Sequence, residues 1–114
     1  MTGTFWQNGK SLDYTNSGES KINANTVITI GDRIGVAGTD IAAGETGSLI
    51  VSGVFEMAKS SSNEIAMGKT VYFDGTGITE AADDGETVPT AYPKAGYAAA
   101  SAGASAEVIL VKID

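Results

Sequence analysis

The 114-residue chain contains neither cysteine nor histidine. Without cysteine it can form no disulfide bond, no thiolate metal site and no cysteine nucleophile, and without histidine it lacks the commonest general base and metal ligand. No glycine-rich loop has the spacing and the lysine of a nucleotide-binding motif. We therefore expect no enzymatic activity, no bound metal and no cofactor.

Basic residues are few and scattered along the chain. Seven lysines and arginines stand against fourteen acidic residues, so the formal net charge is -7 at pH 7. Proteins that bind the nucleic-acid backbone present clustered Lys and Arg, so we expect no direct nucleic-acid binding. No apolar run approaches the roughly 20 residues that span a bilayer, and the chain opens without the basic and apolar regions of a secretory signal. These features predict synthesis in the cytoplasm and no membrane association.

Proline is rare and glycine abundant, with 2 prolines and 15 glycines in the chain. Glycines mark turns at short intervals, and β-branched and aromatic residues fill the runs between them. This pattern predicts an all-β fold, a small single-domain β-barrel or β-sandwich over residues 1–114 with short helical turns and an N-terminal arm over residues 1–10. No repeat with a period of about 20 to 50 residues is evident. The expected strands cover residues 12–14, 26–30, 33–37, 48–57, 70–73, 77–79, 95–98 and 107–113.

The longest expected strand has the sequence SLIVSGVFEM. Successive side chains of a strand point to opposite faces, so Leu49, Val51, Phe55 and Met57 share one face, which we assign to the core. Gly53 interrupts this face, and a glycine inside a strand usually marks a bulge or a tight bend. We therefore expect the strand to bend at Gly53.

The last expected strand, EVILVKI, is apolar on both faces. Ile109, Val111 and Ile113 lie on one side, and Val108 and Leu110 lie on the other. A strand with two apolar faces is usually covered on both. We expect this strand to lie centrally in the sheet, or to have its second face against another subunit.

Two short segments have helix-forming residues followed by glycine. In DIAAGE, Asp40 can cap a single turn that ends at Gly44, because glycine takes a positive φ without strain. Residues 63–67 can form a similar turn ended by Gly68. Neither segment is long enough for an independent helix, so each is expected to be one helical turn between strands.

Two aromatic residues, Phe5 and Trp6, lie in the polar segment TGTFWQNGKS before the first strand. Either they fold back into the protein's own core, or they belong to an arm that docks on a neighbouring protein, because Trp is enriched at binding hot spots. Tyr14, in the first strand, is a third candidate partner-binding residue. In TVYFD, Tyr72 and Phe73 alternate, so one is expected to face the core and the other a surface or subunit boundary.

Carboxylates are the remaining candidates for chemistry. The segment EAADDGET could offer oxygen ligands to calcium, but it lacks the alternating loop pattern with a terminal bidentate Glu, so we expect a solvated loop. No spacing in the chain singles out a carboxylate pair of the kind that hydrolyses glycosides. The acidic residues of this loop are Glu80, Asp83, Asp84 and Glu86.

The stretch GDRIGVAGTDIAAGETGSLIVSGVFEMAK, followed later by GKTVYFD, resembles the DUF2190 family of bacteriophage and prophage proteins, described as capsid cement or head decoration proteins. The resemblance covers most of the chain and also includes SLDYTN at residues 11–16. Two departures are Phe73, where the family commonly has Trp, and Met57-Ala58, where Leu-Pro is frequent. The motif residues that carry the resemblance include Asp40, Gly44, Gly53, Phe55, Tyr72 and Phe73.

This resemblance implies a β-rich, often trimeric protein that binds the outside of a phage head and stabilises the shell against the pressure of packaged DNA. The implied partners are the major capsid protein and two further copies of the chain, as a homotrimer. The implied location is the exterior of the virion capsid, after synthesis in the cytoplasm of the bacterial host. An alternative is a receptor- or glycan-binding β module on the virion surface, and a small enzyme is the third, least favoured, class.

Overall fold

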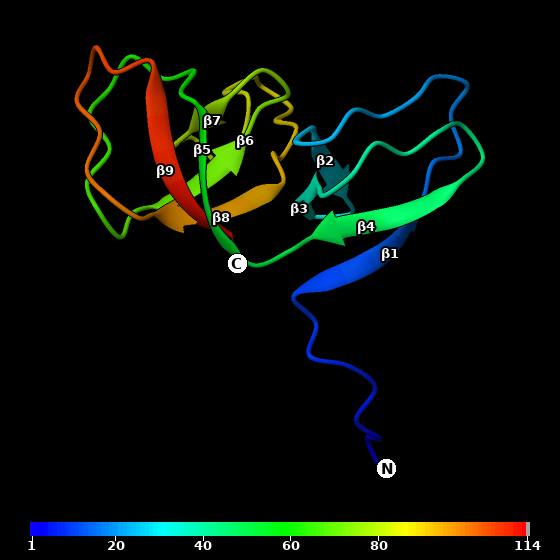
Figure 1. The fold of residues 1–114 in the computed structure, drawn as a ribbon. Coiled ribbons are helices and arrows are strands. Elements are labelled where there is room, and N and C mark those ends of the chain that lie inside the picture. Colours follow the sequence, from blue (N-terminus) through cyan, green and yellow to red (C-terminus); the bar gives the residue numbers. More distant parts are fainter. Residues whose placement is uncertain (114) are drawn as a thin grey trace.

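The computed structural model describes residues 1–113, and within them it contains nine strands and no helix (Figure 1). The all-β prediction is therefore confirmed, and most expected strands lie within two residues of their observed bounds. The sheet is open and mixed, not closed into a barrel. The strands are β1 (Ser11–Thr15), β2 (Val27–Ile30), β3 (Arg33–Ala37), β4 (Thr46–Ile50), β5 (Gly53–Ala58), β6 (Thr70–Phe73), β7 (Ile78–Thr79), β8 (Lys94–Ala98) and β9 (Val108–Ile113).

The sheet consists of two antiparallel halves, which are visible as the two lobes of Figure 1. The first half (residues 11–51) has the strand order β1-β4-β3-β2, and the second half (residues 53–113) has the order β5-β9-β8-β6. A short hairpin adds β7 beside β6. A parallel contact between Arg33 of β3 and Lys94 of β8 joins the halves, which makes the sheet mixed.

The two halves repeat the same pairing pattern. In each half the first strand pairs with the last in a matching register, and the second strand pairs with the third. Just after β1, Asn16 donates its backbone N–H to Glu45 O (2.9 Å), and just after β5, Lys59 donates to Glu107 O (2.9 Å). The counterparts in the first and second halves include Ser11 and Val54, Leu12 and Phe55, Asp13 and Glu56, Tyr14 and Met57, Thr46 and Val108, Ser48 and Leu110, and Leu49 and Val111.

The loops repeat as well. An isolated bridge joins Ile22 to Ile41 in the first half and Ile65 to Ala102 in the second. The halves differ between their second and third strands, where the first half has a two-residue turn and the second half inserts β7 and a long loop. This insertion breaks the constant spacing that would have revealed the repeat in the sequence.

The first expected helical turn is a β-turn. Glu45 N donates to Ala42 O (3.0 Å), and Gly44, at the third position, has φ +80°. Asp40 does not cap this turn, because its Oδ1 accepts a hydrogen bond from the backbone N–H of Ala24 (2.8 Å). The helical prediction is wrong here because a strand begins directly after the turn, which leaves no room for a second helical hydrogen bond.

The turn expected at residues 63–67 is also not helical. Ile65 already forms the bridge to Ala102, and the turn follows it, with Lys69 N donating to Ala66 O (3.1 Å). Gly68 has φ +88°. The glycine therefore shapes a β-turn that leads into β6 rather than ending a helix.

The strand expected at residues 48–57 is divided between the two halves. β4 ends at Ile50 and β5 begins at Gly53, which has φ +115°. The predicted bend at Gly53 is confirmed, and it is the point where the chain passes from the first half to the second. Phe55 and Met57 face the core of the second half, as expected.

The hydrophobic core lies mainly in the second half and extends to β3, so the two halves share it. Phe55 and Phe73 are partly buried against it. Burial of this apolar surface is the main force that holds the halves together. The residues of this shared core are Ile34, Val36, Met57, Ile65, Val71, Ile78, Ala95, Ala98, Ala102, Ile109, Val111 and Ile113. Ala37, Ile41 and Leu49 are also buried, in the first half.

Candidate docking site at the amino-terminal arm

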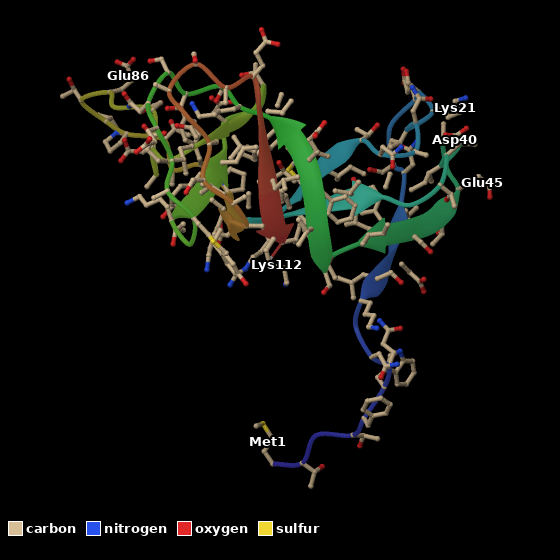
Figure 2. The ribbon with its side chains drawn as sticks, turned by 60° about the vertical axis from the view of Figure 1, so that its left-hand side comes forward. Met1, Lys21, Asp40, Glu45, Glu86 and Lys112 are labelled. Carbon is tan, nitrogen blue, oxygen red and sulfur yellow. The ribbon has the colours of Figure 1, made fainter. Side chains whose placement is uncertain are left out.

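The arm, residues 1–10, extends away from both halves of the sheet (Figures 1 and 2). Phe5 and Trp6 are 80% and 89% exposed. Within the described residues, the arm is hydrogen-bonded to the body near its base, where Val51 N donates to Lys10 O (3.0 Å) and Gln7 Nε2 donates to Ser11 O (3.2 Å). The structure therefore places both rings outside the core, in an arm free to contact another molecule.

β1 continues from the arm and is an edge strand. It pairs with β4, and no other strand among the described residues pairs with it, so its outer edge offers unpaired backbone groups. Tyr14 is half-buried and shares a face with Leu12, which is 39% exposed. The counterpart of Leu12 in the second half, Phe55, packs against the core. β1 thus presents a partly uncovered apolar face beside the arm.

Sequence reasoning identified Phe5, Trp6 and Tyr14 but missed Leu12. The alternation Leu12-Asp13-Tyr14 could have indicated that Leu12 lies on the same face as Tyr14. What the sequence does not contain is how far this face is covered: Leu49, opposite Leu12, is buried, whereas Leu12 itself is exposed. The arm and the Leu12–Tyr14 face together are named the arm site below.

The other motif residues lie away from the arm site, in turns and core-facing strands. Asp40 also lies 3.7 Å from Lys21 Nζ in an exposed ion pair. Tyr72 is half-buried opposite Thr79, and Phe73 packs against the core. These residues therefore shape turns or pack in the fold, and the structure does not bring them together with Phe5 and Trp6.

A cavity of about 350 Å³ opens between the two halves, at the outer edge of β5. Its walls include Val27 from the first half and Met57, Phe73 and Ile78 from the second. In residues 1–113, no group of three or more acidic side chains is placed to hold a metal ion. The same residues include no helix of the length and apolarity that crossing a bilayer requires.

Two carboxylates of the acidic loop, those of Asp83 and Asp84, accept hydrogen bonds from the loop's own backbone. Asp83 Oδ1 accepts from Gly85 N (2.9 Å), and Asp84 Oδ1 accepts from the N–H groups of Glu86 and Thr90 (both 3.1 Å). The hydrogen bond from Glu86 and that from Thr90 lower the pKa of the Asp84 carboxyl. This arrangement is that of a self-capped, exposed loop rather than of a calcium loop.

Asp74 fastens the β6–β7 turn to the end of β5. Its carboxylate accepts hydrogen bonds from Ser60 Oγ (2.7 Å), from Gly77 N (2.9 Å) and from both N and Oγ1 of Thr76 (2.9 Å each). Burial favours the neutral acid, but these hydrogen bonds together outweigh it and lower the pKa of Asp74 to about 2. Asp74 is therefore ionised at neutral pH and stabilises the second half.

No curated protein and no solved structure matched the chain. The family model described as phage cement protein, formerly DUF2190, matches residues 6–113. This match runs from Trp6 of the arm to the end of β9 and confirms the resemblance seen in the sequence. The chain therefore belongs to the family of phage cement proteins, structural and non-enzymatic proteins of the virion that bind the capsid and stabilise it.

Proposed function

We propose that the chain binds the major capsid protein on the outside of the phage head, as a homotrimer, and that the arm site makes the contact. The observation that carries this proposal is the exposure of Phe5 and Trp6 on an arm with almost no contact with the body of the protein. In this proposal residues 11–113 act as one rigid unit, and residues 1–10 reach from it to the shell.

Burial of the two rings would supply the binding energy. A Phe or Trp side chain buries roughly 150–250 Å², and each Å² of apolar surface removed from water is worth about 25 cal/mol. Part of this gain offsets the entropy lost when the arm becomes ordered. A net binding free energy of a few kcal/mol per arm corresponds to a contact that is weak when one arm binds alone.

A trimer would strengthen this contact without any new interaction. Once one arm is bound, the other two arms are held near neighbouring capsid subunits at a high effective concentration. Each bridge adds interface that must break before adjacent capsid subunits separate. Resistance to internal DNA pressure follows from many such bridges over the shell.

The charge distribution supports docking through the arm. All fourteen acidic residues lie after residue 10, and the arm itself contains one lysine and no acid. The acidic body keeps the free protein soluble and resists nonspecific association. The arm carries the apolar rings without this negative charge.

The test is binding to purified heads that lack the cement protein. We expect saturable binding, and electron microscopy of decorated heads should show density on the outer surface at contacts between capsid subunits. The variants Phe5→Ala and Trp6→Ala should each weaken binding by tenfold or more, which is the effect of a hot-spot residue. Val88→Ala is the matched control, because Val88 is 85% exposed but lies in the acidic loop. Unchanged binding by both arm variants would refute the arm site.

A further inference from the structure

The second half has an exposed apolar surface that its own core does not use. Val54, Tyr97, Val108 and Leu110 are exposed to 54%, 41%, 48% and 40%, respectively. They come from the three strands β5, β8 and β9, and β9 lies between the other two. Their neighbours along each strand face inward, as with Ile109 and Val111 in the core.

These side chains form one continuous surface. Paired residues on antiparallel strands share a face. Val54 and Tyr97 both pair with Lys112, while Leu110 pairs with Glu56. Val108 lies on the same face, two residues from Leu110, because side chains alternate along a strand. We name this surface the outer face of the second half.

At three positions the first half shows that strands with this pairing do not require apolar side chains. Its counterparts of Val54, Val108 and Leu110 are Ser11, Thr46 and Ser48, and all three are exposed. The fourth residue, Tyr97, corresponds to Val36, which is buried in the shared core. The two halves therefore differ at the three positions on their first and last strands. Val54, Val108 and Leu110 are therefore not required by the strand pairing itself.

We propose that the outer face of the second half is the surface through which copies of this chain associate with one another. The proposal rests on the homotrimer of the proposed function and assigns its subunit contact, separately from the arm site. Among charged residues, the face carries one acid, Glu56, and one base, Lys112. It is thus neutral in a chain whose net charge is -7, and two such chains can approach with least repulsion where their surfaces are neutral.

Symmetry favours this type of surface. Around a rotation axis every copy contributes the same residues, so an uncompensated charge would be repeated close to itself. Leu110 and Val108 avoid this cost, and Glu56 and Lys112 provide opposite charges on each copy. A stable contact covers about 800 Å² per partner, with an apolar centre and a polar rim. The four apolar side chains supply the centre.

The experiment uses the first half as the source of substitutions. In V54S/V108T/L110S, each residue becomes its counterpart in the first half, a replacement that the same strand pairing already tolerates. Sedimentation of the full chain over a concentration series should give the mass of three 11.6 kDa chains for the native protein and of one chain for the variant. Circular dichroism should be unchanged, and Val88→Thr should leave the trimer intact. Higher salt should strengthen native self-association by screening the repulsion between acidic chains.

Two results would overturn the proposal. One is a native chain that stays monomeric at every concentration, whatever the effect of the triple variant on head binding. The other is a triple variant that folds and still has the mass of the native trimer. If the triple variant does not fold, Leu110→Ser alone decides, with an expected weakening of self-association of about tenfold. A chain lacking residues 1–8 should still form trimers, so failure of the arm site and failure of this surface give different results.

Discussion

Leu110 on β9 occupies the position that Ser48 occupies on β4. Leu110 lies opposite Glu56, and Ser48 lies opposite Asp13. The two halves therefore have an acidic residue at the same position and differ in the residue opposite it, which is leucine in one half and serine in the other. The two halves therefore share a backbone plan and differ in surface. The first half carries the arm site and has Ser11, Thr46 and Ser48 at three exposed positions where the second half, which carries the main core, has the apolar residues Val54, Val108 and Leu110. In our account, one half meets the shell and the other meets further copies of the chain.

Removal of residues 1–8 should weaken attachment to heads while leaving the fold intact. The arm buries no apolar side chain in the core, so the melting temperature should change by no more than about 2 °C, the shift that a few tenths of a kcal/mol produce in a domain of this size. Head binding should fall at least about tenfold. An unfolded truncated chain would show that Phe5 and Trp6 contribute to the core.

Asn16→Ala should destabilise the first half by about 2–3 kcal/mol, because it removes a buried side chain with several partners. Asn16 Nδ2 donates to Ser20 O (2.8 Å) and Ile41 O (3.0 Å), and Oδ1 accepts from Gly18 N (3.0 Å). Denaturant unfolding measures the change. Ser17→Ala, at an exposed neighbour, is the control and should have little effect; equal stability of the two variants would contradict the role given to Asn16.

Asp74→Asn should lower stability at neutral pH by roughly 1–2 kcal/mol, a value reduced for solvent screening. The pKa of Asp74 is lowered from 3.8 to about 2 by folding. Ionisation therefore stabilises the folded state above pH 3.8, and this contribution is lost as the pH falls towards 2. The difference between the native chain and the variant should shrink over that window in urea unfolding at several pH values. A difference that stayed constant down to pH 2 would argue against an ionised Asp74 as its source.

Gly44→Val should cost about 1–2 kcal/mol, because Gly44 has φ +80° and a β-branched residue is strained there. No atom lies within 4 Å of an added Cβ, so the cost comes from the backbone alone. Gly44→Asn should cost less. Asn25 already holds φ +71° at the same position of the turn before β2. Thermal unfolding should rank the native chain first, then Gly44→Asn, then Gly44→Val; the reverse order of the two variants would contradict the backbone explanation.

The strands were predictable because their signals are local. Alternation placed Leu49 and Met57 in the core, and glycines marked the turns on either side. The pairing of β1 with β4 was not predictable, because Leu12 and Leu49 lie 37 positions apart in the sequence and no local pattern records the contact. Single turns were misread as helical, since an alanine-rich segment of four residues fits a β-turn equally well.

The arm site was predicted in part. Phe5 and Trp6 are conspicuous in a polar segment, and the sequence left open whether they enter the core. Their exposure depends on how the two halves fill the core without them, which is a property of the whole fold. For the last strand the sequence left two alternatives, a central position in the sheet or a second face against another subunit. The central position is confirmed, because β9 lies between β5 and β8, and the subunit contact stays a proposal. Thr46 and Ser48 are recognised as the counterparts of Val108 and Leu110 only from the strand register, which the sequence does not give.

The central claim is that the chain stabilises the capsid by binding its outside. The most direct measurement is the release of DNA from heated or osmotically shocked heads that lack the cement protein, with and without the purified chain. The account predicts that the native chain raises the temperature of DNA release in a saturable manner and that the chain lacking residues 1–8 does not at the same concentration. DNA release at the same temperature with saturating native protein bound to the heads would contradict it.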